Sequence, residues 1–126
     1  MKVLVNAYAV SPIKGSEPGL GWNWIIALSK FCELHVITEG EWKEDIERSI
    51  HSLGVSNVQF YYLPVEEYVR NICWNQGDWR FYYYYRKWEQ RAYKLAKEII
   101  STEEIDIVHK LNMGGFREPS YFSRLE

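Results

Sequence analysis

Two short polar segments hold most of the side chains in this sequence that are suited to binding a ligand. The first, residues 15–22, reads Gly-Ser-Glu-Pro-Gly-Leu-Gly-Trp and leads into an apolar segment of helical length. Glycines at a helix N-terminus leave backbone N–H groups uncovered, and such a terminus attracts phosphate or another oxyanion. The alternative is an ordinary strand-to-helix turn that uses glycine only for its backbone angles. The candidate anion-binding residues are Gly15, Ser16, Glu17, Gly19 and Gly21.

The second segment follows an apolar run at residues 105–111. His109 lies near the end of this run, and Asn112, Arg117 and Glu118 come after it. His109 is the candidate catalytic residue, because the carboxyl end of a strand in an open α/β sheet faces the crevice where ligands bind. A hydrogen-bonded structural histidine is the alternative. The three polar residues that follow are suited to binding hydroxyls, phosphates or sugars. A simple ion pair between Arg117 and Glu118 is the structural alternative.

Neither segment matches a standard nucleotide-binding motif. The dinucleotide fingerprint needs Gly-x-Gly-x-x-Gly directly after the first strand, whereas these glycines come late and at a different spacing. No Gly-Lys-Ser/Thr closes a phosphate-binding loop. Glu39 stands at the end of the expected second strand, where a ribose-binding acid would lie. An exposed charge at a strand end is the simpler interpretation of Glu39.

The remaining histidines and the cysteines predict neither a metal site nor a disulfide framework. His35 lies inside an expected strand and is interpreted as structural, and His51 lies on the exposed side of an expected helix. Cys32 and Cys73 have no zinc-ligand spacing and are expected to be free thiols. We expect no metal and no resident cofactor.

Alternating strands and helices are expected to position the two polar segments. Apolar runs predict strands at residues 2–8, 33–38, 57–63 and 105–111. Helical spacing of apolar residues predicts helices at residues 19–31, 41–53 and 81–101, with Gly54 ending the second. The first of these helices is apolar almost all round, which is typical of a helix buried against a sheet. Residues 64–80 are ambiguous and fit a short helix and a loop.

This order of elements predicts an α/β fold. We expect a Rossmann-like parallel sheet of strand order 3-2-1-4 with helices on both faces, in three α/β/α layers. The first and fourth strands are then neighbours, and the loops at residues 9–21 and 109–118 meet at a topological switch point. Ligands of open α/β sheets bind beyond the carboxyl ends of the strands at such a point.

The composition is that of one globular domain. The chain has 126 residues, of which 47% are apolar and 25% charged, and this excludes disordered, collagen-like and coiled-coil proteins. No apolar run approaches the roughly 20 residues that span a membrane, and no signal peptide precedes the first strand. The net charge of −2 disfavours a nucleic-acid partner. We therefore expect a cytoplasmic protein.

An aromatic and basic stretch marks the long helix expected at residues 81–101. Tyr82, Tyr83, Arg86 and Lys87 fall off its apolar stripe. Basic and aromatic side chains together are suited to an anionic membrane surface or a lipid-phosphate acceptor. A solvated basic helix face is the structural alternative, and we favour it.

Two motifs resemble a known enzyme family. Residues 11–24 read Ser-Pro-Ile-Lys-Gly-Ser-Glu-Pro-Gly-Leu-Gly-Trp-Asn-Trp, and residues 105–119 read Ile-Asp-Ile-Val-His-Lys-Leu-Asn-Met-Gly-Gly-Phe-Arg-Glu-Pro. They resemble the first loop with its helix and the fourth-strand segment of a branch of the family-4 glycosyltransferases. Their order and separation also resemble that branch, and together the two motifs are fairly specific.

The resemblance implies a type-B glycosyltransferase fold, with two Rossmann-like domains facing across a cleft. The N-terminal domain of such an enzyme mainly binds the acceptor, and the C-terminal domain binds a nucleotide-sugar donor. Transfer retains the anomeric configuration and needs no metal. By this resemblance, the glycine-rich loop approaches the donor phosphates and acceptor, and His109 lies beside the transferred sugar.

Residues 1–126 would then be the N-terminal domain, and the C-terminal donor-binding domain is absent from them. The implied partners are a nucleotide sugar as co-substrate and a glycan or lipid-linked acceptor, in polysaccharide or glycolipid synthesis at the inner membrane face. The isolated chain is expected to be inactive as a transferase. An uncapped edge at the fourth strand is expected to cause weak self-association.

Two other classes of function stay open at this stage. One is a small dinucleotide-binding oxidoreductase domain, which the absent glycine fingerprint disfavours. The other is a non-catalytic module that binds a partner or a membrane through the stretch at residues 79–91.

Overall fold

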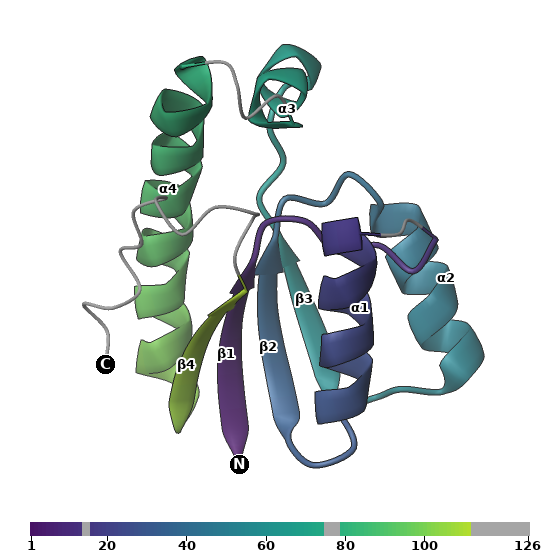
Figure 1. Cartoon of the computed structure of the whole chain (residues 1–126). Helices are drawn as coiled ribbons and strands as arrows, with labels where there is room; N and C mark the ends of the chain where they lie inside the picture. The colour runs from purple at the N-terminus through teal and green to yellow at the C-terminus, as the bar shows by residue number, and fades with distance from the viewer. Residues whose placement is uncertain (14–15, 75–78, 112–126) are drawn as a thin grey trace.

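The computed structural model describes residues 1–13, 16–74 and 79–111, and Figure 1 shows their arrangement. Strands and helices alternate in the expected order, and the ambiguous region at residues 64–80 contains a short helix, α3, which is one of the structures it fits. The elements are β1 (Lys2–Ala7), α1 (Ser16–Leu28), β2 (Glu33–Thr38), α2 (Lys43–Leu53), β3 (Val58–Tyr62), α3 (Glu67–Trp74), α4 (Arg80–Thr102) and β4 (Ile107–Leu111).

The four strands form one parallel sheet in the order β3-β2-β1-β4, as the sequence predicts. All four arrows in Figure 1 run in the same direction. In the register, Val5 of β1 lies between Val36 of β2 and His109 of β4. The direction of strand addition reverses at β1, because β2 and β4 flank it although β4 comes last in the described chain. This reversal is the expected switch point.

Helices cover both faces of the sheet, which confirms the α/β/α layering. On one face, Val5 and Val36 pack with Ile25 of α1 and Ile46 of α2. On the other face, the side chains of β1 and β2 pack against α4. The second face includes Leu4, Tyr8, Ile37, Phe81, Tyr85, Trp88, Ala92, Ala96 and Ile99. Within the described ranges, no helix is long and apolar enough to cross a membrane.

Helix α4 owes its position to the apolar stripe read from the sequence. The stripe residues from Phe81 to Ile99 are buried or half-buried against the sheet, while Tyr82 and Tyr83 are 42% and 52% exposed. One residue of the buried face is a carboxylate, Glu89, which is fully buried. Glu89 follows Tyr85 by four positions, so helical spacing places it on the stripe.

Helix α1 packs against the sheet along one side only. Trp22 and Ile25 are in the core, but Leu20 is 69% exposed. Phe31, expected at the end of this helix, lies beyond it and is 83% exposed. Helix α1 therefore packs against the sheet, as predicted, and some of its apolar residues lie on its outer side. A helix on an outer layer contacts the sheet along one side only, whatever the composition of its other side.

Among the residues that the structure describes, Gly40 and Gly54 take left-handed backbone angles, and they allow a matched prediction. Gly54 ends α2 as expected, with φ 68° and open space where a Cβ would lie, whereas at Gly40 (φ 95°) a Cβ would meet Tyr62 Cδ1 at 2.9 Å. Both alanine substitutions incur a backbone penalty of about 1–2 kcal/mol. Only Gly40→Ala adds a steric conflict. Urea unfolding, monitored by tryptophan fluorescence, should show that Gly40→Ala lowers the free energy of unfolding more than Gly54→Ala does. Equal reductions in the two variants would contradict this prediction.

Candidate functional site

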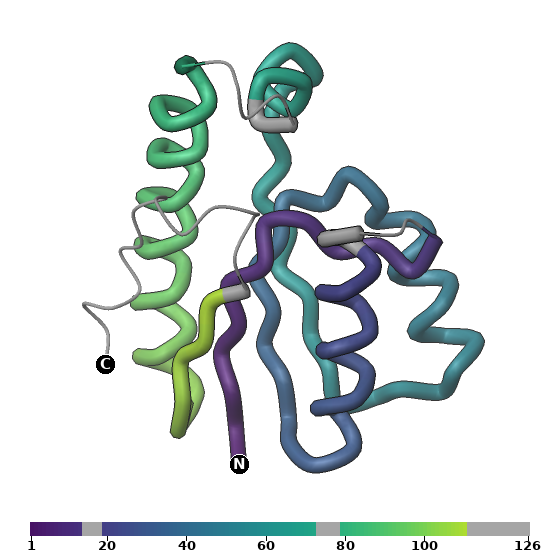
Figure 2. The backbone as a smooth tube through the Cα atoms, in the orientation of Figure 1, coloured from purple at the N-terminus to yellow at the C-terminus, as the bar shows by residue number. Residues whose placement is uncertain are grey.

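The predicted site lies at the carboxyl edge of the sheet, where β1 and β4 end side by side. Ala7 pairs with Leu111 at this edge. Figure 2 shows the chain leaving β1 and crossing above the strand ends toward α1. The carbonyl of Tyr8 accepts hydrogen bonds from Thr38 Oγ1 and Glu39 N, both at 3.0 Å, and so fastens this segment to the end of β2.

The structure describes only part of the predicted anion-binding set. Helix α1 begins at Ser16, so Gly19 lies in its first turn and Gly21 in its second. The first four N–H groups of a helix have no partner within it, and the amide of Gly19 is the last of these. Gly15, Asn112, Arg117 and Glu118 lie outside the described residues. The structure does not describe the side chains of Ser16 and Glu17.

His109 lies within β4, on the face of the sheet that α1 covers. Its ring stacks on Trp24 of α1, with centroids 4.8 Å apart and planes 13° from parallel. The side chain remains exposed. His109 pairs with Val5 of β1 in the register, so it belongs to the strand and not to the loop beyond it. It lies two residues before Leu111, where β4 ends.

The opposite face of the same edge carries a buried polar pair that the sequence analysis missed. Asn6 Nδ2 of β1 donates to Glu89 Oε1 of α4 at 2.8 Å, and both side chains are buried. Asn6 Oδ1 finds no hydrogen-bond donor among the residues described. Lys110, beside Asn6 in the register, places its ammonium 5.4 Å from the ring centroid of Tyr85. A polar residue in an otherwise apolar buried strand was the available signal.

Glu39 differs from its expected role. It is 1% exposed, so the interpretation as an exposed charge at a strand end is wrong. Arg70 of α3 donates to both oxygens of this carboxylate, and the backbone N–H of Val65 donates to Oε1 at 3.2 Å. The hydrogen bond with Glu39 is also the main cause of the raised pKa of Arg70. Both oxygens of this carboxylate already accept hydrogen bonds within the protein, so Glu39 is poorly suited to bind the hydroxyls of a ribose.

The aromatic and basic residues predicted on α4 lie at the surface, as expected from their place off the stripe. Lys87 Nζ lies 4.7 Å from the ring centroid of Tyr83. A side-chain hydrogen bond with Tyr83 is the main cause of the raised pKa of Lys87. Arg86 is exposed. A cavity of about 270 Å³ lies next to these residues, between the segment after β3 and the two helices α3 and α4. Its lining includes Val65, Val69, Tyr84, Lys87, Trp88 and Arg91.

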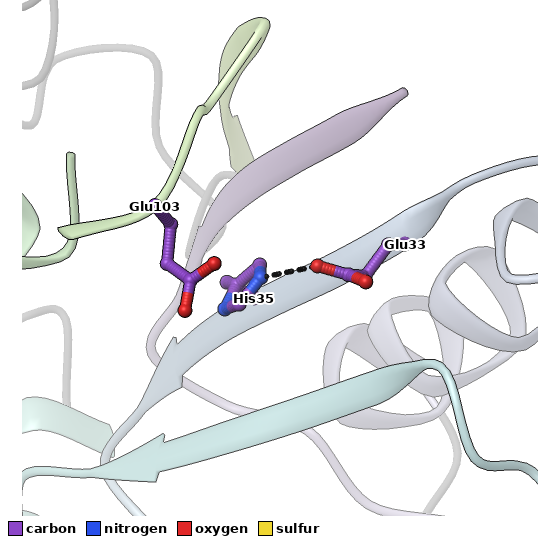
Figure 3. A group of neighbouring side chains, drawn as sticks. All are labelled: Glu33, His35 and Glu103. Carbon is purple, nitrogen blue, oxygen red and sulfur yellow. Dashed lines mark hydrogen bonds and ion pairs between the residues drawn. The ribbon is translucent and has the colours of Figure 1, made fainter.

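A second cluster of ionisable groups lies at the amino edge of the sheet. His35 Nε2 is 2.9 Å from Glu33 Oε2, and its Nδ1 is 3.0 Å from Tyr61 Oη. The ligand atoms of Glu33, His35 and Glu103 lie within 4.8 Å of one another (Figure 3). The hydrogen bond with His35 is the main cause of the lowered pKa of Glu33. His35 is buried, as the structural interpretation expects, but its neighbours are metal-ligating groups.

Comparisons with known proteins add no assignment. No protein-family model matches the chain, and neither a curated protein nor a solved structure matches it. The case for a function therefore depends on the two sequence motifs and on the geometry described above.

Proposed function

We propose that this chain is the acceptor-binding part of a retaining glycosyltransferase that uses a nucleotide-sugar donor. One observation carries the proposal. Two motifs resemble family-4 glycosyltransferases, and in their described parts residues 11–13 and 16–24 follow β1, while residues 105–111 lead into and form β4. Because β1 and β4 are neighbours in the sheet, these described parts lie beside the switch point, where ligands of such sheets bind.

The start of α1 supports a role in binding an oxyanion. The positive end of the helix dipole, and first-turn N–H groups that have no partner within the helix, suit a diphosphate. Gly19 lies in this first turn and has no side chain to hinder a ligand's approach. In the proposed reaction, these amides stabilise the negative charge that develops on the leaving diphosphate.

The cavity between α3 and α4 lies at the carboxyl edge of the sheet, on the face that α4 covers, and it is suited to bind the acceptor. Tyr84 presents aromatic surface there, next to the buried Trp88, and Lys87 and Arg91 add positive charge. A mixture of aromatic walls and a few cations suits a glycan, or a lipid-linked acceptor that carries phosphate. Tyr82, Tyr83 and Arg86 extend the basic aromatic surface on α4, where a membrane contact is a further part of the proposal.

The structure weakens the dinucleotide alternative. In that alternative the acid at the end of β2 binds the ribose hydroxyls. Glu39 is instead buried and held by Arg70 and the Val65 amide. Together with the absent glycine fingerprint, this favours a nucleotide-sugar enzyme over an oxidoreductase.

Nucleotide binding at the start of α1 is the direct test. Isotope-labelled chain titrated with UDP, GDP and their sugars should show NMR shift changes concentrated at the first turn of α1 for one nucleotide family. Gly19→Phe should weaken that binding at least tenfold by covering the amides, a loss of about 1.4 kcal/mol. Leu20→Phe adds bulk to the neighbouring exposed residue and should leave binding unchanged.

Other results of this titration would contradict the proposal. Shift changes with NAD and with none of the nucleotide sugars would favour the oxidoreductase alternative. Equal weakening by Gly19→Phe and Leu20→Phe would remove the helix N-terminus from the site. No change at α1 with any nucleotide sugar or acceptor glycan, in this chain and also in a longer protein that joins it to a donor-binding domain, would argue for the non-catalytic module.

A further inference from the structure

The amino edge of the sheet holds a preformed set of metal-ligating groups, far from the carboxyl edge discussed above. Glu33 and His35 come from β2, and Glu103 directly follows α4. Figure 3 shows the imidazole of His35 between the two carboxylates. The same three residues line a cavity of about 270 Å³ that opens at this edge.

His35 is the best-fixed member of this set. Only 3% of the residue is exposed. Tyr61 Oη holds Nδ1 at 3.0 Å, and this leaves Nε2 directed at Glu33 and the cavity. A metal-binding histidine characteristically has its second ring nitrogen held by a hydrogen-bond partner in this manner. A hydroxyl can either donate to Nδ1 or accept from it, so Tyr61 serves both tautomers.

A cation already belongs to this cluster. Lys2 Nζ lies 2.9 Å from Glu103 Oε2 and 3.7 Å from Glu33 Oε2. The two carboxylates therefore converge on one position where positive charge is favourable. The Lys2 side chain is 34% exposed, so it is free to turn toward solvent if another cation takes its place.

We propose that Glu33, His35 and Glu103 form a binding site for a zinc-type divalent metal ion. One imidazole nitrogen and two carboxylate oxygens are ligands that zinc accepts, and three protein ligands leave a fourth position for water. Ligand atoms of tetrahedral zinc lie about 3.4 Å apart, given bonds of about 2.1 Å. The present separations, all within 4.8 Å, require only side-chain adjustment.

The imidazole also selects among metals. Magnesium and calcium prefer sites made wholly of oxygen, whereas imidazole suits zinc and its late first-row neighbours. A bound ion would connect the start of β2 to the end of α4, and so fix the long helix on the sheet. The inference is independent of the proposed glycosyltransferase role, and it goes beyond the sequence-based expectation of no metal.

Calorimetric titration of the tag-free chain with Zn²⁺ tests the proposal. We expect one ion per chain and no competition from millimolar Mg²⁺. Glu103→Gln, at a half-buried position, should weaken binding at least tenfold, and Tyr61→Phe should weaken it about tenfold because it removes the group that orients the imidazole. Lys2→Met removes the competing ammonium and should tighten binding about three- to tenfold.

His51→Gln is the matched control, because His51 is exposed on α2 and outside the cluster. It should leave the zinc affinity unchanged. His35→Gln should abolish binding, and if this buried variant does not fold, Glu103→Gln and Lys2→Met still decide the matter. Absence of zinc binding in both the parent chain and Lys2→Met would overturn the proposal. Binding that Glu103→Gln leaves intact would overturn it equally.

Discussion

Arg70→Met should destabilise the chain by about 3 kcal/mol, because it leaves the buried carboxylate of Glu39 without its cation. The Glu39 side chain is 2% exposed, and the Arg70 side chain is 23% exposed. Removing one member of a buried ion pair typically lowers the free energy of unfolding by about 3–5 kcal/mol, and the partial exposure of Arg70 places the effect at the lower end. Methionine retains much of the apolar stem of arginine, so the loss reports mainly on charge.

A double-mutant cycle separates the charge from the packing. Glu39→Gln alone should cost less than Arg70→Met, because the partly exposed guanidinium can still be hydrated. The double variant should recover part of the loss, with a coupling of about 1–3 kcal/mol. Urea unfolding of the four proteins at equal pH gives the required free energies. If the two single reductions in the free energy of unfolding add up to that of the double variant, Arg70 and Glu39 do not interact energetically.

The ion pair between Arg70 and Glu39 illustrates why the regular strands and helices could be predicted from sequence, whereas α3 could not. The strands β1 to β4 and the helix α4 carry strong apolar periodicity, and each was predicted within about two residues of its observed ends. Helix α3 has only eight residues, and the sequence pattern there does not distinguish a short helix from a loop. Its position depends on Arg70 reaching Glu39, a contact between residues 31 apart that no local pattern encodes.

The polar pairs near both edges of the sheet escaped prediction for the same reason. Glu39 stands at the start of an acidic stretch, and local composition therefore indicated an exposed charge. The partners Asn6 and Glu89 are 83 residues apart, and His35 meets Glu103 only after the whole βαβ sequence has folded. Glu89 nonetheless occupies a stripe position of α4, so helical spacing would have revealed its burial.

His109→Ala should lower the turnover of a longer protein that joins this chain to a donor-binding domain, by about a hundredfold. This prediction depends on the proposed function, in which the imidazole lies beside the transferred sugar and takes part in the proton or charge movements of transfer. The loss should fall mainly on kcat, because an interaction made in the transition state is removed. Initial rates at saturating donor and acceptor measure it.

His109→Phe tells a chemical role from a packing role. The His109 ring stacks on Trp24 at 4.8 Å, and alanine removes this contact together with the ring nitrogens. Phenylalanine keeps an aromatic ring for Trp24 and removes only the nitrogens, so a chemical role predicts that both variants lose turnover equally. If His109→Phe keeps the parental rate while His109→Ala loses it, the residue acts by holding β4 against α1. The catalytic group would then have to be sought among other residues at the carboxyl edge, with the buried Glu89 as the next to substitute.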